Sequence, residues 1–126
     1  MTTAKAGSTN SLNRNFLTDC NLTYAVQLMG GRWKLPILTR LNKGKRRFSE
    51  LKKVIPNITE RMLTLQLREL ERDGLISRTV YAEVPPRVEY ELTVIGKELI
   101  PVCLQLHDWG AKHKLLHLGT ESSLPL

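Results

Sequence analysis

The sequence is poor in cysteine and has no long apolar run. Its two cysteines, Cys20 and Cys103, are too few for a disulfide framework and lack the paired spacing of a structural zinc site, so we interpret them as thiols. No apolar run approaches the roughly 20 residues of a membrane span, and the first residues lack the apolar centre of a signal peptide. These absences favour a cytoplasmic protein that does not associate with a membrane.

Sequence patterns typical of enzymes are also missing. There is no glycine loop of the kind that binds phosphate, and no local context suggests a catalytic set of Ser, His and Asp or of Cys and His. His113 and His117 could chelate a metal, but no third ligand is obvious, which favours surface or interface histidines. A thiol oxidoreductase would need a second cysteine two residues from Cys20, and none is there. We therefore predict a protein without enzymatic activity, cofactor or metal site.

Positive charge is concentrated in the middle of the chain. The 126 residues carry a formal net charge of +7. Residues 32–87 hold 14 Lys or Arg against 6 Asp or Glu, whereas the residues before them contribute +1 and those after them −2. A chain of this length is expected to form one domain. A basic centre between nearly neutral ends predicts a polyanion-binding core whose ends serve another purpose.

Residues 57–74 form the most clearly bounded predicted helix. Thr59 is a suitable N-cap, because its hydroxyl can accept from an otherwise unpaired backbone N–H. Glu60 places negative charge in the first turn, where the helix dipole favours it. Gly74 can adopt the left-handed conformation that ends a helix. The sequence therefore predicts both ends of this helix.

The two faces of this helix differ in chemistry. At about 100° per residue, one face carries three leucines: Leu63, Leu67 and Leu70. The opposite face carries three arginines: Arg61, Arg68 and Arg72. Arginine binds phosphate and guanine edges bidentately, and Leu65 between the arginines can contact a thymine methyl, so this face can read nucleic acid. The alternative is a solvated face on which Arg68 and Arg72 pair with Glu71 and Glu69.

A shorter helix is predicted immediately before it, over residues 49–55 with Ser49 as N-cap. Two helices joined by a tight turn form a helix-turn-helix unit. In such a unit the first helix crosses the DNA backbone and the second enters the major groove. Lys52 and Lys53 would then contact phosphates and position the protein, while the second helix reads the bases.

Two extended segments follow, at residues 75–82 and 88–93. In the second, apolar residues alternate strictly with Glu89 and Glu91, as in a half-buried strand, whereas Arg78 falls on the apolar side of the first. A hairpin after a recognition helix, with Arg87 near its tip, has the form of a wing that contacts the backbone or minor groove. A solvated loop residue is the alternative for Arg87. The predicted DNA-binding residues are Thr59, Arg61, Thr64, Leu65, Arg68, Arg46, Arg47, Lys52, Lys53 and Arg87.

Further helices are predicted on both sides of this unit. One begins at Cys20 and ends at Gly30, and a second carries Trp33 to Leu41; a last one is capped by Thr93 and bent by Pro101. Its apolar stripe is longer than a small domain needs, which suggests pairing with a second copy. The predicted dimer interface is Leu22, Val26, Leu99, Val102, Cys103, Leu106, Trp109 and His113, although Cys103 could instead be a small core residue. We expect a flexible tail at residues 1–14, one domain at residues 15–118 and a frayed end at residues 119–126.

Several motifs together resemble the HxlR-type winged helix-turn-helix regulators of bacteria and archaea: GGRWKLPIL, RRFSEL, ITERMLTLQLRELERDGLI, VPPRVEYELT, IGKEL and DWG. The resemblance covers about residues 20–110. It implies a mainly α fold with a small β-hairpin and terminal dimerisation helices. It also implies a homodimeric regulator that binds double-stranded DNA, with repression or activation left open. A winged helix that only binds proteins is the rival interpretation, but it would not need the arginine face.

The resemblance also bears on Cys20. In several members of this family, a cysteine just ahead of the first helix senses oxidants or electrophiles, and Cys20 occupies that place. The helix dipole favours a thiolate there, although adjacent Asp19 opposes it. The resemblance thus implies that an oxidant or small-molecule effector could act through Cys20. A disulfide between Cys20 and Cys103 of another subunit is left open.

Overall fold

The computed structural model describes residues 20–119. The tail predicted for residues 1–14 and nearly all of the frayed end predicted for residues 119–126 therefore lie outside the described residues. The chain divides into two compact units, Met1–Gly31 and Arg32–Leu126, and each is described by itself. Within residues 20–119, no helix is long and apolar enough to cross a membrane.

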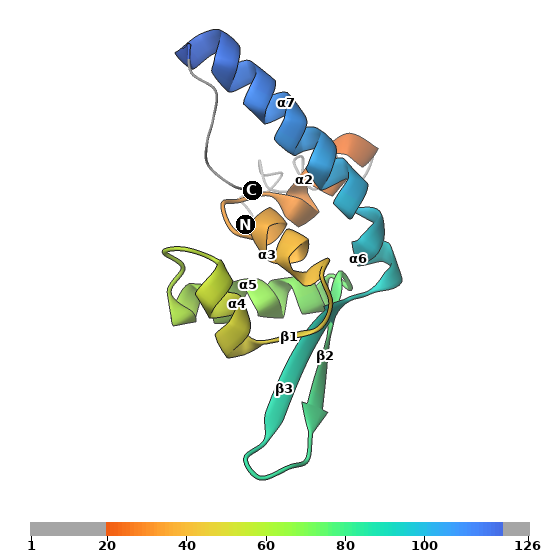
Figure 1. Cartoon of the computed structure of the whole chain (residues 1–126). Helices are drawn as coiled ribbons and strands as arrows, with labels where there is room; N and C mark the ends of the chain where they lie inside the picture. Colours follow the sequence, from red (N-terminus) through yellow and green to blue (C-terminus); the bar gives the residue numbers. More distant parts are fainter. Residues whose placement is uncertain (1–19, 120–126) are drawn as a thin grey trace, which may run out of the picture. The chain divides into compact units, whose positions relative to one another are not determined.

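Most of the described chain is helical, and the strands form one small sheet (Figure 1). The elements in chain order are α2 (Asn21–Met29), α3 (Lys34–Leu41), β1 (Arg46–Arg47), α4 (Phe48–Val54), α5 (Glu60–Arg72), β2 (Ile76–Tyr81), β3 (Arg87–Leu92), α6 (Val94–Glu98) and α7 (Ile100–Leu118). In the first unit, α2 follows Cys20 and ends at Gly30, as predicted. The predicted mainly α fold with a small β component is confirmed.

Both ends of α5 are where the sequence predicts them. The Thr59 hydroxyl oxygen accepts a hydrogen bond from the Met62 N–H at 3.1 Å. At the other end Gly74 has a φ of 76°, and the Leu75 N–H donates to the Leu70 carbonyl at 3.0 Å. This is a Schellman motif, in which a left-handed residue lets the chain satisfy the last carbonyls of a helix.

The leucine face of α5 packs into a single core shared with α3, α4 and the sheet. The buried members of this core are Ile37, Leu38, Leu41, Leu51, Ile55, Ile58, Leu63, Leu67, Leu70, Leu75, Ile76, Leu92 and Ile100. Fully burying one such side chain is worth about 1.5–3 kcal/mol. Core packing therefore fixes which side of α5 remains available for binding.

The first helix of the helix-turn-helix unit, α4, begins one residue earlier than predicted. Its N-cap is Arg47, and the Glu50 carboxylate accepts a hydrogen bond from the Arg47 N–H at 2.7 Å. The prediction of Ser49 as N-cap is therefore wrong. The reason is that a glutamate at the third helical position can bond back to the N-cap N–H and so start the helix earlier. Lys52 and Lys53 lie on α4, as predicted.

The sheet contains one strand more than the predicted hairpin. Its order is β1-β3-β2, and both pairings are antiparallel. In β1, Arg46 pairs with Tyr90 and Arg47 pairs with Glu89. The short strand before α4 thus joins the helix-turn-helix unit to the wing, and β3 becomes the central strand.

The strict alternation of buried and exposed residues expected in β3 is not observed. Glu89 and Glu91 are half-buried, like Val88 and Tyr90, whereas Leu92 is buried. Both carboxylates have cationic partners, because Glu89 lies 3.4 Å from Arg87 Nε and Glu91 lies 4.0 Å from Lys45 Nζ. The two glutamates are thus held beside cationic side chains, which leaves them half-buried where full exposure was expected.

The last predicted helix consists of two helices, α6 and α7. Thr93 caps α6 as predicted, with its hydroxyl oxygen accepting from the Gly96 N–H at 3.1 Å. α6 ends at Glu98, and α7 begins at Ile100 with Pro101 in its first turn. A proline is tolerated there because the first N–H groups of a helix lack intrahelical partners. Pro101 therefore starts a new helix instead of bending one.

Candidate nucleic-acid interface

Four of the predicted DNA-binding residues share one surface of α5 with Glu60: Arg61, Thr64, Leu65 and Arg68. This surface lies opposite the buried leucines. Both arginines are exposed, and Leu65 keeps 45% of its surface accessible. The surface combines guanidinium groups, which suit guanine edges and phosphates, with an apolar side chain that suits a thymine methyl. It thus has the chemistry of a reading face.

The two threonines on this side of α5 differ in their free hydrogen-bonding groups. Thr64 Oγ1 donates to the Glu60 carbonyl at 2.8 Å, so its proton is used within the helix. The Thr59 hydroxyl accepts from the Met62 N–H, and its own proton has no acceptor among the described residues. Thr59 can therefore donate to a phosphate at the start of α5, whereas Thr64 offers its methyl group.

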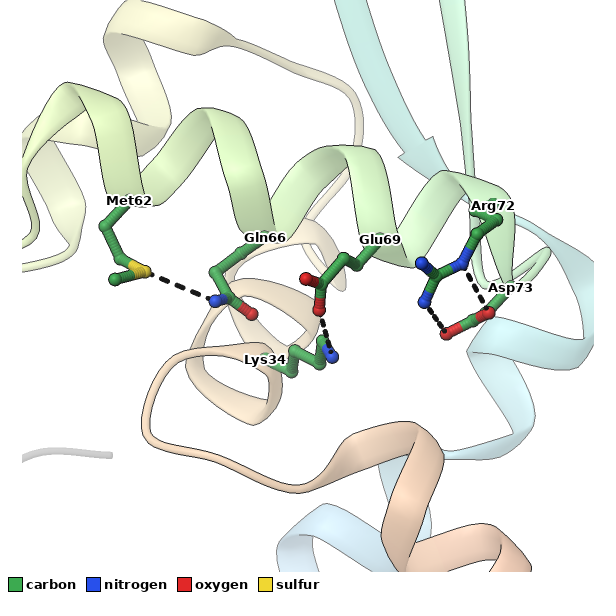
Figure 2. A network of polar contacts seen from close by, with 6 residues as sticks. All are labelled: Lys34, Met62, Gln66, Glu69, Arg72 and Asp73. Atoms are coloured by element: carbon green, nitrogen blue, oxygen red, sulfur yellow. Dashed lines mark hydrogen bonds and ion pairs between the residues drawn. The ribbon is translucent and has the colours of Figure 1, made fainter. Parts of the chain in front are cut away.

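The third arginine of the face, Arg72, is bound within the protein. Its Nε lies 3.2 Å from Asp73 Oδ1, and a second guanidinium nitrogen lies 3.5 Å from Asp73 Oδ2. The alternative in which Arg72 pairs with Glu69 is wrong, because Glu69 has a different partner. Figure 2 shows that partner, Lys34 of α3, whose Nζ lies 2.7 Å from Glu69 Oε1.

The Lys34–Glu69 ion pair fixes α5 against α3. The Lys34 side chain is 11% exposed and that of Glu69 is 29% exposed, so the pair is largely removed from water. On the same side of α5, the Gln66 amide nitrogen lies 3.3 Å from Met62 Sδ (Figure 2). The ion pair between α3 and α5, together with the buried leucines, sets the rotation of α5 about its axis and keeps its arginine face turned outward, whereas the Gln66–Met62 contact lies within α5.

Arg46, predicted to contact DNA, makes a hydrogen bond within the protein, and its contact with DNA stays a prediction. Its Nε donates to the Arg40 carbonyl at 3.0 Å, and Arg40 Nε donates to the Val54 carbonyl at 3.2 Å. Arg40 thereby connects α3 to the last turn of α4. Arg46 and Arg40 position the helix-turn-helix unit, whereas the neighbouring Arg47 remains exposed.

Arg87 is neither at the tip of the wing nor a solvated loop residue. It is the first residue of β3, and its side chain is 26% exposed. Its guanidinium group lies 3.2 Å from Glu83, 3.4 Å from Glu89 and 4.1 Å from the centre of the Tyr81 ring. Two carboxylates and an aromatic face therefore hold its guanidinium group at the base of the loop, and its contact with DNA stays a prediction.

Other cations of the basic centre keep their charge available. Arg61, Arg68, Lys52 and Lys53 make no ion pair or side-chain hydrogen bond with another described residue. The same holds for Arg78, an exposed residue of β2 that was not among the predicted DNA-binding residues. The sequence did offer one signal for Arg78: it is a charged residue on the otherwise apolar side of the first extended segment.

Cys20 is the N-cap residue of α2, and its sulfur is held by a neighbour in the same unit. The Thr23 hydroxyl donates to Cys20 Sγ at 3.1 Å. This hydrogen bond, supported by the Thr23 and Leu22 backbone N–H groups, lowers the pKa of the Cys20 thiol. Burial instead raises the pKa of Cys103, which is 3% exposed. The two thiols therefore differ in reactivity.

Apolar side chains are exposed on α2 and on α7. On α2 they include Leu22 and Val26; on α7 they include Val102, Leu106 and Trp109, the last of which is 63% exposed. The His113 ring stacks between Trp109 and His117, with centroid distances of 5.2 and 4.0 Å. Each helix therefore presents an apolar surface of the kind that subunit contacts cover.

Two residues predicted for the dimer interface are less exposed than the others. Cys103 is buried, so the interpretation of it as a small core residue is confirmed and its place in the interface is corrected. Leu99, between α6 and α7, is partly buried and packs against the core. The place of Leu99 in the dimer interface stays a prediction.

These elements define a winged helix-turn-helix protein: α4 and α5 form the helix-turn-helix, and β2 with β3 forms the wing (Figure 1). The chain belongs to the HxlR-like helix-turn-helix family, whose model matches residues 28–117. Its relatives include YdeP of Bacillus subtilis, described as an uncharacterized HTH-type transcriptional regulator. The two sequences are 55% identical over 95 residues, which cover 75% of this chain and 74% of YdeP.

Solved structures of redox regulators are similar to this chain. The reduced form of the redox regulator HypR matches with a TM-score of 0.75 and 42% identity, covering 80% of this chain and all of HypR. The reduced form of the transcriptional regulator YodB from Bacillus subtilis matches with a TM-score of 0.68 and 32% identity, covering 80% of this chain and 96% of YodB.

Proposed function

We propose that this chain is a homodimeric transcriptional regulator that recognises a specific DNA sequence through α5 and carries out no catalytic step. The observation that carries the proposal is the α5 surface on which Arg61, Leu65 and Arg68 are exposed together and the two arginines have no partner among residues 20–119. The reading face would enter the major groove. Lys52, Lys53, Arg47 and the Thr59 hydroxyl would contact phosphates beside it.

The test is the selection of preferred duplexes from a random DNA pool by the full chain. A two-fold symmetric site with half-sites about one helical turn apart, or a multiple of this, supports both specific recognition and the dimer. The exposed apolar surfaces of α2 and α7 are the surfaces that we assign to dimer formation. Binding without sequence preference would favour the protein-interaction alternative and overturn the proposal.

Substitutions on α5 and α4 are expected to have different consequences. Arg61→Ala should reduce the preference for the selected site by about 1–3 kcal/mol, because it removes a base contact. Lys52→Ala should weaken binding to every duplex alike and lower the salt slope of log K by about one unit, because it removes a phosphate contact. Affinity measured on selected and unrelated duplexes at several salt concentrations separates the two outcomes.

Arg72→Ala is the matched control for Arg61→Ala, because it removes the same charge from the same helix at a site where Asp73 already binds the guanidinium. It should leave the sequence preference unchanged. If Arg61→Ala, Lys52→Ala and Arg72→Ala behaved alike, the division between reading and positioning residues would be wrong. Leu65→Ala should change which base is preferred at one position of each half-site, because it removes an apolar contact.

We further propose that Cys20 makes DNA binding responsive to oxidants or electrophiles. Two observations support this proposal: the Thr23 hydrogen bond that favours its thiolate, and the similarity to the redox regulators named above. A thiolate is the reactive form of cysteine, so a lowered pKa increases its reactivity near neutral pH. Comparing operator affinity of the wild type and Cys20→Ser, with and without a mild oxidant, tests the proposal. If wild type and Cys20→Ser responded equally to the oxidant, Cys20 would not be the sensing residue.

The reactivity of Cys20 should depend on Thr23. Because the Thr23 hydroxyl stabilises the thiolate, Thr23→Ala should raise the pKa of Cys20 and move the pH midpoint of its alkylation upward. In the wild type the midpoint should lie below that of an ordinary cysteine, which is about 8.5. Alkylation by iodoacetamide, followed by mass spectrometry over a pH series, measures the midpoint, with Cys103 as the slow internal reference. An unchanged midpoint in Thr23→Ala would contradict the assignment.

A further inference from the structure

The face of the hairpin that turns toward α5 is apolar at the root of the hairpin and polar further out. At the root of the hairpin, Ile76 of β2 pairs with Leu92 of β3, and both are buried. One rung further out on the same face, Arg78 pairs with Tyr90. This rung marks the point where the wing leaves the protein core, as the hairpin in Figure 1 extends beyond α5.

A groove of about 310 Å³ lies at this point between α5 and the sheet. Its lining comes from three elements: Thr64, Leu67, Arg68 and Glu71 of α5, Arg78 of β2 and Tyr90 of β3. Arg68 belongs both to this groove and to the reading face. The groove is therefore continuous with the surface proposed to enter the major groove.

The charged groups of the groove are not neutralised by one another. Neither Arg68 nor Arg78 lies within ion-pair distance of Glu71 or of any other carboxylate among residues 20–119, and the Tyr90 hydroxyl has no hydrogen-bond partner among them. Arg87, Arg72 and Lys34 do have such partners. Two guanidinium groups and one carboxylate leave the groove with a net charge of +1, which matches the single negative charge of a phosphodiester.

We propose that this groove binds one backbone phosphate of DNA, held by Arg78 and the Tyr90 hydroxyl at the junction of the recognition helix and the wing. The inference rests on the proposed function. A guanidinium group can give a phosphate two parallel N–H donors, and the phenol adds an O–H donor from the adjacent strand. Arg68 adds positive potential from α5. The contact fixes the wing relative to the reading face, so Arg78 and Tyr90 are positioning residues and carry no sequence preference.

The first experiment compares wild type, Arg78→Gln and Tyr90→Phe on the selected duplex and an unrelated one, by fluorescence anisotropy over a salt series. Arg78→Gln keeps most of the side-chain length and should weaken binding to both duplexes roughly tenfold. It should also lower the salt slope by about 0.9. Tyr90→Phe keeps the ring and should weaken both a few fold with an unchanged slope, because it removes only a neutral donor. Arg72→Ala is the control for a loss of charge on a nearby surface.

A second experiment locates the phosphate. Neutral methylphosphonates replace the phosphates of the selected duplex one at a time, and affinity is measured for wild type and Arg78→Gln. At one position in each half-site, the loss seen with wild type should disappear in Arg78→Gln, because both changes remove the same contact. The absence of such a position, or wild-type affinity and salt slope in Arg78→Gln, would overturn the inference and leave the proposed function intact.

Two further outcomes are distinguishable. If inorganic phosphate, exchanged for chloride at equal ionic strength, stabilised wild type but not Arg78→Gln while DNA affinity stayed equal, the groove would be a site for free phosphate and the inference would be wrong. If wild type bound no duplex at all, the proposed function and the phosphate site would fail together. Tyr90→Phe provides the same test should Arg78→Gln not fold.

Discussion

Glu69→Ala is expected to destabilise the protein by about 3 kcal/mol, although Glu69 lies on the helix that we assign to DNA recognition. The reason is that the substitution removes the ion-pair partner of Lys34. Lys34 is 9% exposed, and Glu69 Oε1 lies 2.7 Å from its ammonium nitrogen. Without this carboxylate the ammonium group remains in the core unpaired, which is among the most unfavourable single changes in a folded protein. Urea unfolding at a fixed protein concentration measures the difference.

Replacing the other partner, Lys34, is expected to destabilise the protein less. Lys34→Met replaces the ammonium group with an apolar side chain of similar length, and the remaining Glu69 is 29% exposed and can be hydrated. We expect a loss of about 1 kcal/mol, and about the same or less for the double substitution Lys34→Met with Glu69→Leu, since apolar groups often replace a buried pair without loss. Equal losses in the two single variants would contradict this asymmetry.

The exposed pair of Arg72 and Asp73 provides a control on the same helix. The Arg72 side chain is 68% exposed, so its ion pair is screened by water. Arg72→Ala should leave the free energy of unfolding nearly unchanged, as is usual for surface pairs. The contrast with Glu69→Ala separates the effect of burial from the effect of losing an ion pair.

The ends of α5 were predictable because adjacent residues determine them. Thr59 caps a helix whose first N–H groups follow it directly, and Gly74 occupies the position after the helix where the chain turns with a positive φ. The leucine face was predictable for the same reason, since a period of 3.6 residues is a local property. The exposed position of Leu65 follows from that period.

Contacts between elements distant in the sequence could not be predicted in this way. Lys34 and Glu69 are both residues that normally face water, and no local pattern indicates that α3 and α5 bring them together. The strand β1 has two residues, too few for any alternation, and it forms only because Arg46 comes to lie beside Tyr90. The partners of Arg87 likewise depend on the fold of the wing.

Gly96→Ala is expected to destabilise the protein by about 3 kcal/mol, or to prevent folding, because the added methyl group has no space. A Cβ at Gly96 would lie 2.1 Å from the Leu75 carbonyl oxygen and 3.1 Å from the Leu75 carbonyl carbon. Both are backbone atoms, so no side-chain rotation can relieve the overlap. Either α6 or the start of the wing must move.

The position of this glycine gives the substitution a consequence for binding as well. Leu75 joins the end of α5 to β2, and its carbonyl also accepts from the Thr93 N–H at 3.1 Å. The Thr93 hydroxyl donates to the Gly74 carbonyl at 2.7 Å. This junction therefore determines the angle between the recognition helix and the wing. Under conditions where Gly96→Ala remains folded, its affinity for DNA should fall. The reason is that the angle between the recognition helix and the wing changes, so the reading face and the groove at Arg78 cannot both contact the same duplex.

Gly110→Ala is the matched control. Gly110 lies within α7, and among the described residues a Cβ there would meet no atom within 4 Å apart from its own chain neighbours and helix backbone. Replacing a helical glycine by alanine where space allows should stabilise the protein by about 0.5–1 kcal/mol. Thermal unfolding of both variants, at one concentration and with circular dichroism at low temperature, compares them directly. Similar stabilities for Gly96→Ala and Gly110→Ala would mean that the junction adapts freely, and the angle between α5 and the wing would then not be fixed by Gly96.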